Sequence, residues 1–406
     1  MNTFSDRMST LKPSIIREIF KYTADPTVIS FAAGNPSPDA FPVETIQKLT
    51  ADILRENPVG ALQYSISEGY APLREWIKTD LTQKNIFTAG DDDVIITSGA
   101  QQAIEIMTKL ICNEGETIIC EAPSFIGSLN TFRSYKAKLV GVEMDDEGID
   151  LEKLESALKA NPKTAFIYLI PTFQNPTGKC MSLNRRKAVL ELANKYRVMI
   201  LEDNPYGDLR FAGVDLPTLK ELDENRLVVY AGSFSKTLAP GLRVGFLCAS
   251  ENITQKAVVC IQASTVHTSI LPQMLVHKFV AEPANARPAS PVVSPFEAHI
   301  ERLVLLYKAK CKLMLDNLKF NMPHSIDFTE PEGGLFIWGT LPDGGDMVTF
   351  CKKAVENKVA IVPGNAFLVD EGDPCTSFRL NFSCPSDEQI ERGVEILSTV
   401  AKRTYK

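Results

Sequence analysis

Between about residue 90 and residue 250, short apolar runs alternate with segments whose apolar residues recur at helical spacing. Strands that alternate with helices of roughly 10 to 15 residues indicate βαβ units and a largely parallel sheet. The pattern predicts an α/β fold with a mostly parallel seven-stranded sheet between helices. The expected strands lie in 93–99, 116–125, 137–144, 164–171, 198–206, 227–235 and 243–250, and the expected helices in 100–111, 127–135, 151–160 and 182–196.

The two ends of the chain follow a different pattern. Residues 14–22 place Ile15, Ile16, Ile19 and Phe20 on one helical face, and an apolar run then enters a loop rich in turn residues. After residue 296 a long helix to about residue 320 precedes a mixture of strands and helices. We expect an N-terminal segment (1–45) that joins a small α+β domain (296–406), with the large domain (46–295) between them.

One stretch between the two expected domains has no assigned role. Residues 281–296 contain four prolines, which predicts a loop between a helix that ends near Val280 and the long helix.

Composition narrows the class of protein. The 406 residues carry a formal net charge of −7, which argues against a nucleic-acid-binding surface. Nine cysteines are scattered without a CxxC pair, and the four histidines form no HExxH motif. This predicts reduced thiols in the cytoplasm and no metal site. No signal peptide and no run of about 18 apolar residues occurs, so we expect no membrane span.

Polar motifs follow the expected strands at the point where each one ends. In open α/β sheets, ligands bind at the carboxyl ends of the strands. The motifs TSG (97–99), EAPSF (121–125), QNPTG (174–178), EDNPY (202–206) and GSFSK (232–236) all fall there. This edge of the sheet is therefore the candidate site.

Lys236 is the first candidate for chemistry. A single lysine is usually a solvated surface charge. Lys236, however, ends an apolar strand among Ser233, Ser235 and Arg243. A lysine amine can form a Schiff base with a carbonyl group, and burial or nearby cations lower its pKa for that purpose.

Each of the other motifs can be interpreted as a purely structural feature or as part of a ligand-binding site. Gly99, Ala100 and Gln101 open a helix whose N-terminus could bind phosphate, although a glycine turn explains them equally well. Phe125 could stack on a ring or belong to the core. Asn175 could contact a ligand or only form the turn.

Asp203 ends a buried strand, where a carboxylate is costly without a partner such as a pyridinium, a helix cap or a salt bridge. Tyr206, three residues later, could hydrogen-bond the same ring. The order of the polar residues is more specific than any one of them. Asn175 precedes Asp203 by 28 residues, Asp203 precedes Lys236 by 33, and Lys236 precedes Arg243 by seven.

The motifs TSGAQQA, QNPTGK, EDNPYGDL and SFSKTLAPGLRVG together resemble the class I/II aminotransferases of fold type I, which depend on pyridoxal 5′-phosphate. The resemblance covers nearly the whole chain. It is strongest to the branch with 2-aminoadipate, kynurenine and aromatic aminotransferases, and it extends to the catalytic domains of MocR-type regulators.

The resemblance implies a role for each candidate. Lys236 would form the Schiff base, Asp203 would pair with the pyridine nitrogen, and Asn175 and Tyr206 would bond the ring oxygen. Arg379 would clamp the substrate α-carboxylate, a task that suits a planar guanidinium. The remaining roles are ring stacking for Phe125, phosphate binding for Gly99, Ala100, Gln101, Ser233, Ser235 and Arg243, closure over the substrate for Gly34 and Asn35, and contact with the neighbouring subunit's cofactor in a homodimer for Tyr64.

One position departs from the family pattern. Ala100 stands where relatives often carry Ser or Thr, so backbone N–H groups must replace that hydroxyl at the phosphate.

The implied reaction is a ping-pong transfer of an amino group from an L-amino acid (2-aminoadipate, aromatic or branched-chain) to a 2-oxo acid such as 2-oxoglutarate, with Lys236 as general acid and base. Two alternatives stay open. A carbon–sulfur lyase or decarboxylase could use the same site, because the cofactor contacts do not separate these reactions. A regulator that only senses the cofactor would need a DNA-binding domain, which we do not expect here because the first fold strand starts about 30 residues into the chain and no basic arm precedes it.

Overall fold

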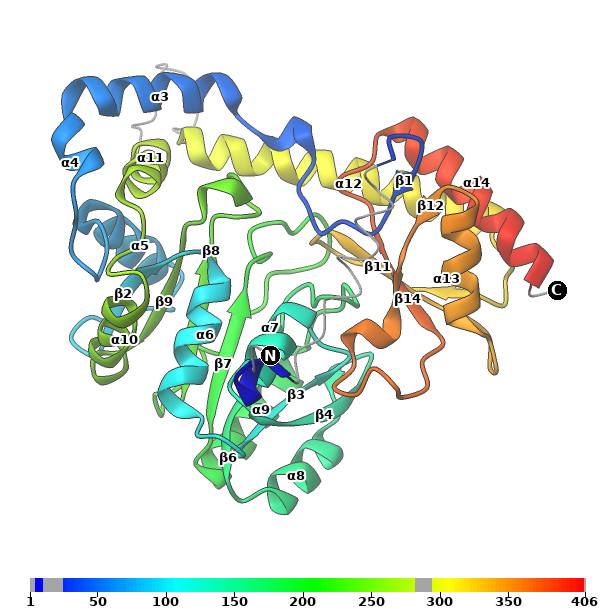
Figure 1. The fold of residues 1–406 in the computed structure, drawn as a ribbon, viewed down its shortest axis with the longest axis horizontal. Coiled ribbons are helices and arrows are strands. Elements are labelled where there is room, and N and C mark those ends of the chain that lie inside the picture. Colours follow the sequence, from blue (N-terminus) through cyan, green and yellow to red (C-terminus); the bar gives the residue numbers. More distant parts are fainter. Residues whose placement is uncertain (1–3, 10–24, 282–293, 405–406) are drawn as a thin grey trace.

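A computed structural model describes residues 4–9, 25–281 and 294–404 of the chain (Figure 1). Within these residues the central sheet has eight strands in the order β2-β9-β8-β7-β6-β3-β4-β5. Their bounds are β2 Asp92–Thr97, β3 Thr117–Ala122, β4 Lys138–Asp145, β5 Gly148–Ile149, β6 Thr164–Leu169, β7 Met199–Asn204, β8 Val228–Ser233 and β9 Gly245–Ser250.

The pairing is mostly parallel, as expected. Strands β4, β3, β6, β7 and β8 are joined by parallel ladders, and β9 runs antiparallel to both β8 and β2. The seven expected strands are all present. The eighth, β5, is a two-residue strand that turns back on β4 through a short connection and pairs with it antiparallel. Because two residues carry no recognisable alternation, the sequence pattern did not reveal it.

Strand side chains alternate between the two faces of the sheet, and each face has its own helices. Ile118 and Phe166 pack with helices α6, α7 and α10, whereas their chain neighbours Ile119 and Ile167 pack with α8 and α9. Side chains of a pleated strand point alternately to the two faces of the sheet. Both faces are apolar here because helices cover both of them. The helices are α6 Ala100–Ile111, α7 Ile126–Ser134, α8 Leu151–Ala160, α9 Leu183–Tyr196 and α10 Glu251–Ser264.

A third group of helices covers the β2–β9 end of the sheet. Val94 and Phe246 pack there against apolar side chains of α3, α5 and α11. The bounds are α3 Val43–Glu56, α4 Pro58–Leu62, α5 Ala71–Gln83 and α11 Ile270–Val280. Figure 1 shows these helices at the opposite end of the molecule from the C-terminus.

The C-terminal lobe contains a second, antiparallel sheet of order β10-β11-β14-β13. Beside it, β1 pairs in parallel with β12, so the chain near Ile29 joins this lobe. The bounds are β1 Ile29–Ser30, β10 Asp327–Phe328, β11 Phe336–Thr340, β12 Val359–Ala360, β13 Val362–Pro363, β14 Ser377–Asn381, α12 Pro295–Asn321, α13 Met347–Glu356 and α14 Asp387–Thr404.

Helix α12 connects the two lobes. Ser294 caps it in a reciprocal box with Glu297, and Pro295 occupies its first position, where a missing N–H costs nothing. Phe296 packs with the cluster of α3, α5 and α11, whereas Tyr307 lies in the core of the C-terminal lobe. Figure 1 shows α12 running from the side of α11 to the side of α14.

Two expected features fall outside the described residues, namely the helix at 14–22 and most of the proline-rich loop at 281–296. The short helix α1 Asp6–Ser9 and the 3-10 turns Pro38–Ala40, Pro240–Leu242 and Gly364–Phe367 complete the elements. Over the described ranges, no helix combines the length and the apolar character that a bilayer span needs. Those ranges also hold no cluster of three or more His, Cys, Asp or Glu residues that could bind a metal ion.

Candidate active site

A cavity of about 320 Å³ lies between the carboxyl ends of the central strands and the C-terminal lobe. It is lined by residues that are far apart in the sequence. Of the sequence-predicted site residues, those that line it are Gly34, Asn35, Ala100, Gln101, Phe125, Asn175, Asp203, Tyr206, Ser233, Ser235, Lys236, Arg243 and Arg379. Asp203 and Ser233 sit at the ends of the adjacent parallel strands β7 and β8, which is why they meet.

Two predicted residues have other places. Gly99 caps α6 just outside the lining. Tyr64 does not line this cavity among the described residues: 80% of it is exposed, and its ring meets His267 edge-on. Its expected role concerns a neighbouring subunit rather than its own.

The Lys236 amine is held inside the cavity. Its Nζ donates to the carbonyl oxygen of Gly34 at 2.6 Å. Burial, and then the positive charges of Arg379 and Arg243, lower the pKa of Lys236 to about 8. A lysine with such a pKa is neutral in a useful fraction of molecules near neutral pH, so it can act as a nucleophile or a base.

Asp203 is buried with half of its carboxylate unpaired. Its Oδ2 accepts a hydrogen bond of 2.7 Å from the hydroxyl of Tyr168, and its Oδ1 has no partner among the described residues. Burial raises the pKa of Asp203 to about 6, and the Tyr168 hydrogen bond opposes that rise. A buried acceptor without a donor is costly, which points to a ligand that brings an N–H group or a positive charge.

Sequence reasoning missed Tyr168. Its ring is fully buried in strand β6, inside an apolar run that predicts only core packing. Only the pairing of β6 with β7 reveals that its hydroxyl faces Asp203.

One end of the cavity suits an anion. The first N–H groups of α6 lack partners within their own helix, and Ser233, Ser235 and Arg243 face the same space. Ser233 Oγ donates to Ser235 Oγ at 2.9 Å, and Arg243 Nη1 lies 3.5 Å from Ser235 Oγ. Gly99 has φ +72, and a Cβ atom there would lie 2.4 Å from Arg243 Nη2. Glycine is therefore required for the guanidinium to lie this close to the helix terminus.

The Gln101 side chain is already engaged. Its Nε2 donates to Gly127 O at 3.1 Å and to Thr131 Oγ1 at 2.7 Å. What Gln101 can offer an anion is its backbone N–H, as Ala100 does.

The opposite end of the cavity suits a carboxylate. Arg379 Nη1 donates to Asn175 Oδ1 at 2.9 Å and Nη2 donates to Ala32 O at 2.8 Å. The guanidinium carbon lies 4.3 Å from the ring centroid of Phe336 and 5.0 Å from that of Phe367. Its buried Nε has no partner among the described residues, and burial lowers the pKa of Arg379 to about 10.

Asn175 links this arginine to a phenol. Its Nδ2 donates to the hydroxyl of Tyr206 at 3.4 Å, and burial raises the pKa of that hydroxyl. Sequence analysis overlooked Phe336 and Phe367, because aromatic residues in apolar runs signal a core and nothing more.

The comparisons with known proteins agree with this geometry. Residues 26–397 match the family described as aminotransferase class I and II. The chain belongs to this family. It is 36% identical to aromatic-amino-acid aminotransferase 1 of Thermococcus litoralis, over 99% of this chain and 95% of that protein. It is 37% identical to 2-aminoadipate transaminase of Thermus thermophilus, over 98% of this chain and 96% of the relative.

The fold of this aminotransferase is also that of its relatives. Kynurenine aminotransferase of Pyrococcus horikoshii, solved with PMP, KYN as substrates and KYA as products, superposes with a TM-score of 0.92 at 35% identity, over 99% of this chain and 98% of the other. The chain is therefore an enzyme of the fold type I aminotransferases.

The residues present fit the family cofactor, pyridoxal phosphate. The unpaired Oδ1 of Asp203 matches a protonated ring nitrogen, and the Gly99–Arg243 cradle matches a phosphate. The Lys236 amine lines the same cavity as both. The three groups satisfy the three chemical demands of that cofactor.

Proposed function

We propose that this aminotransferase moves the amino group of an L-amino acid to a 2-oxo acid such as 2-oxoglutarate by a ping-pong mechanism. The observation that carries the proposal is that the Lys236 amine, the half-paired Asp203 carboxylate and the Arg379 guanidinium line one cavity of about 320 Å³. An amine, an anion for a ring nitrogen and a carboxylate clamp are the parts that amino-group transfer requires.

Each residue has a defined task in the proposed reaction. Pyridoxal phosphate, when bound, supplies the aldehyde that accepts the amino group and the ring that withdraws electrons. Lys236 Nζ takes the proton from the substrate α-carbon, which its lowered pKa of about 8 allows near neutral pH. Asp203 keeps a positive charge on the ring nitrogen favourable.

The remaining residues orient the two ligands. Arg379 would bind the α-carboxylate with the guanidinium N–H groups that its hydrogen bonds to Asn175 and Ala32 leave free. Asn175 and Tyr206 would hydrogen-bond the ring oxygen, and Phe125 would stack on the ring. Gly34 and Asn35 would close over the substrate, while Ala100, Gln101, Ser233, Ser235 and Arg243 would hold the phosphate.

The walls of the cavity support aromatic, branched-chain or 2-aminoadipate donors. Phe336 gives apolar surface beside the proposed carboxylate site, and Ile104 and Ile170 add apolar lining to the same cavity. Such surface accommodates the stem of an aliphatic side chain or the ring of an aromatic one. Relatives named for aromatic amino acids and 2-aminoadipate at 36% and 37% identity support the same range.

We propose a homodimer with shared active sites. Tyr64 lies on the surface with exposed apolar neighbours, namely Val59, Leu62 and Ile66, which are 72%, 73% and 53% exposed. An exposed apolar patch of this kind is typical of an interface between proteins. The nine cysteines are free thiols, which supports a reducing compartment such as the cytoplasm.

The division into domains is a proposal as well. We propose a cofactor-binding domain of residues 46–295, and a small domain of residues 296–406 joined by residues 1–45. The β1–β12 pairing and the core shared by Ile29 and Val359 support the second unit.

A half-reaction tests the proposed function. The protein is loaded with pyridoxal phosphate, single amino acids are added, and the cofactor absorbance is followed while products are assayed. Conversion of the cofactor to its amine form with release of the matching 2-oxo acid would establish transamination and rank the donors. If the spectrum returned unchanged while ammonia and pyruvate, or carbon dioxide, accumulated, a carbon–sulfur lyase or decarboxylase would replace the proposal.

A further inference from the structure

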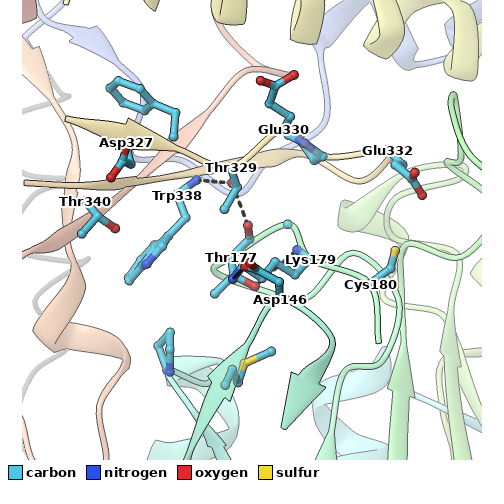
Figure 2. Close-up of a pocket in the computed structure, with 15 residues that line it drawn as sticks. Asp146, Thr177, Lys179, Cys180, Asp327, Thr329, Glu330, Glu332, Trp338 and Thr340 are labelled. Atoms are coloured by element: carbon cyan, nitrogen blue, oxygen red, sulfur yellow. Dashed lines mark hydrogen bonds and ion pairs between the residues drawn. The ribbon is translucent and has the colours of Figure 1, made fainter. Parts of the chain in front are cut away.

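A second, larger hollow lies outside the active-site cavity. It has a volume of about 730 Å³ and is lined by residues near 144–146, 177–180 and 327–332, together with Trp338 and Thr340 (Figure 2). Strands β10 and β11 form one wall and the turn after β6 forms the other. Figure 2 shows Thr329 on the wall of the hollow, joined by dashed lines to Trp338 and to Thr177.

The Thr329 hydroxyl uses both of its hydrogen-bonding functions. Its Oγ1 donates to the carbonyl oxygen of Thr177 at 2.9 Å and accepts from the backbone N–H of Trp338 at 2.9 Å. The Thr329 N–H in turn donates to Trp338 O at 2.9 Å. One side chain therefore joins the turn after β6 to strand β11.

Trp338 and Thr177, the two hydrogen-bond partners of the Thr329 hydroxyl, are both close to residues of the proposed carboxylate site. Trp338 lies opposite Arg379 in the β11–β14 ladder. Thr177 follows Asn175 by two residues, and Asn175 Oδ1 accepts the hydrogen bond from Arg379. Thr329 thus closes a ring of contacts through these four residues, although it does not line the active-site cavity itself.

The turn that carries Asn175 is stiff enough to transmit this contact. Thr177 donates both its N–H and its hydroxyl to Gln174 Oε1, at 2.9 Å and 2.8 Å. Gly178 has φ +71, and a Cβ atom there would lie 2.6 Å from Phe336 O, so the turn touches strand β11 directly. A shift of Thr177 would therefore displace Asn175 as well.

We propose that Thr329 is a positioning residue that keeps the Asn175 turn in register with Arg379. This inference rests on the proposed function, because it assigns Arg379 to the substrate α-carboxylate. Thr329 acts from outside the cavity, through Thr177 on one side and Trp338 on the other. Its loss weakens carboxylate binding more than it slows the chemistry at Lys236.

The test uses Thr329→Val, which keeps the shape of the side chain and removes the hydroxyl. We expect KM for the amino donor to rise about three- to tenfold, the effect of one or two hydrogen bonds, while kcat stays within about twofold. Thr329→Ser keeps the hydroxyl and should restore KM. Thr340→Val is the matched control, because Thr340 lies on the same sheet and hydrogen-bonds Ser377 Oγ at 3.0 Å instead of the turn.

A binding measurement separates this inference from the proposed function. The probe is 3-phenylpropanoate, a carboxylate without an amine, titrated against the cofactor absorbance of the loaded enzyme. We expect its dissociation constant to rise in Thr329→Val in parallel with KM. If the wild-type enzyme bound the probe but did not transaminate, the proposed function would be contradicted and the proposed role of Thr329 would not be.

Three results would overturn the inference. One is an unchanged dissociation constant in Thr329→Val, and another is an equal rise in Thr340→Val. The third is a loss of kcat with KM unchanged, which would place the effect on the chemistry. If Thr329→Val does not fold, Thr329→Ala gives the same comparison with Thr329→Ser.

Discussion

The two ends of the active-site cavity are built in different ways. The end that we propose holds the cofactor takes Lys236, Asp203, Ser233 and Ser235 from neighbouring strand ends of one sheet. The end that we propose holds the substrate depends on Arg379, which reaches Asn175 from a different sheet and lies near two aromatic rings. The first end is organised by the order of the strands, and the second by contacts between lobes.

This difference predicts that the cofactor end keeps its geometry when the lobes move, whereas the substrate end does not. A strand end is held by a ladder of backbone hydrogen bonds, so its side chains point to the same place whatever the neighbouring lobe does. A contact between lobes moves when either lobe moves. We therefore expect changes at the cofactor end to abolish chemistry and changes at the substrate end to alter affinity.

Replacement of Lys236 breaks the cofactor end most severely. Lys236→Ala removes the amine that we propose binds the cofactor and moves the proton, so turnover should fall at least about a thousandfold. Steady-state rates and the cofactor spectrum measure the effect. Lys256→Ala, at an exposed lysine of α10, is the control and should leave both unchanged. Normal activity in Lys236→Ala would contradict the assignment.

Arg379→Lys breaks the substrate end. A lysine cannot offer two parallel N–H donors, so KM for the amino donor should rise about 30-fold or more. Cofactor affinity should change little, because Arg379 is not among the groups that we propose hold the phosphate. Titration of the cofactor and steady-state kinetics give the two quantities. Arg226→Lys, at a surface ion pair with Asp91, is the control. Lost cofactor binding in Arg379→Lys would show that the two ends are not independent.

Tyr168→Phe tests whether the hydrogen bond from Tyr168 controls the pKa of Asp203 at the cofactor end. It removes the 2.7 Å hydrogen bond that lowers the pKa of Asp203, so that pKa should rise and the carboxylate should become a weaker partner for a ring nitrogen. We expect kcat/KM to fall about tenfold, with a shift in the pH dependence of the cofactor spectrum. The control is Tyr135→Phe, which removes a hydrogen bond to Glu105 at the surface. An unshifted spectrum would contradict the role of Tyr168.

Glu121 gives the smallest expected effect on activity and a distinct effect on stability. Its Oε2 accepts from Ile170 N and Gln174 Nε2, and burial raises its pKa from 4.5 to about 8. The folded protein binds the Glu121 proton more tightly than the unfolded chain does. The resulting contribution of Glu121 to the free energy of unfolding is therefore complete below pH 4.5, and it is lost as the pH rises towards 8. The loss is about 1.4 kcal/mol in the free energy of unfolding per pH unit in that window.

Glu121→Gln cannot ionise and should escape this loss. Denaturant unfolding at pH 5 and pH 8 should show a smaller decrease for the variant than for the wild type. Glu191→Gln, at an exposed position of α9, should follow the wild type. Identical pH dependence in wild type and Glu121→Gln would show that Glu121 stays charged in the folded protein.

The sequence predicted more of the residues at the cofactor end of the cavity than at the substrate end. The strand pattern predicted all seven long strands and the long helix α12, whereas the two-residue strand β5 carried no signal. The motifs at strand ends led to Lys236 and Asp203. Tyr168 and Phe367 lie among apolar residues. The contact of Tyr168 with Asp203 depends on the neighbouring strand β7, and the contact of Phe367 with Arg379 depends on how the turn Gly364–Phe367 packs against β14.

The sequence by itself determined the α/β class, the family and the set of polar residues at the strand ends, because periodicity and local motifs are written in consecutive residues. Only the tertiary structure decided which of those groups lack partners. The hydrogen bonds from Tyr168 to Asp203, from Arg379 to Asn175 and from Thr329 to Thr177 each join residues that are 35 or more positions apart. Distance, burial and hydrogen-bond satisfaction are properties of the packed chain, so no local pattern encodes them.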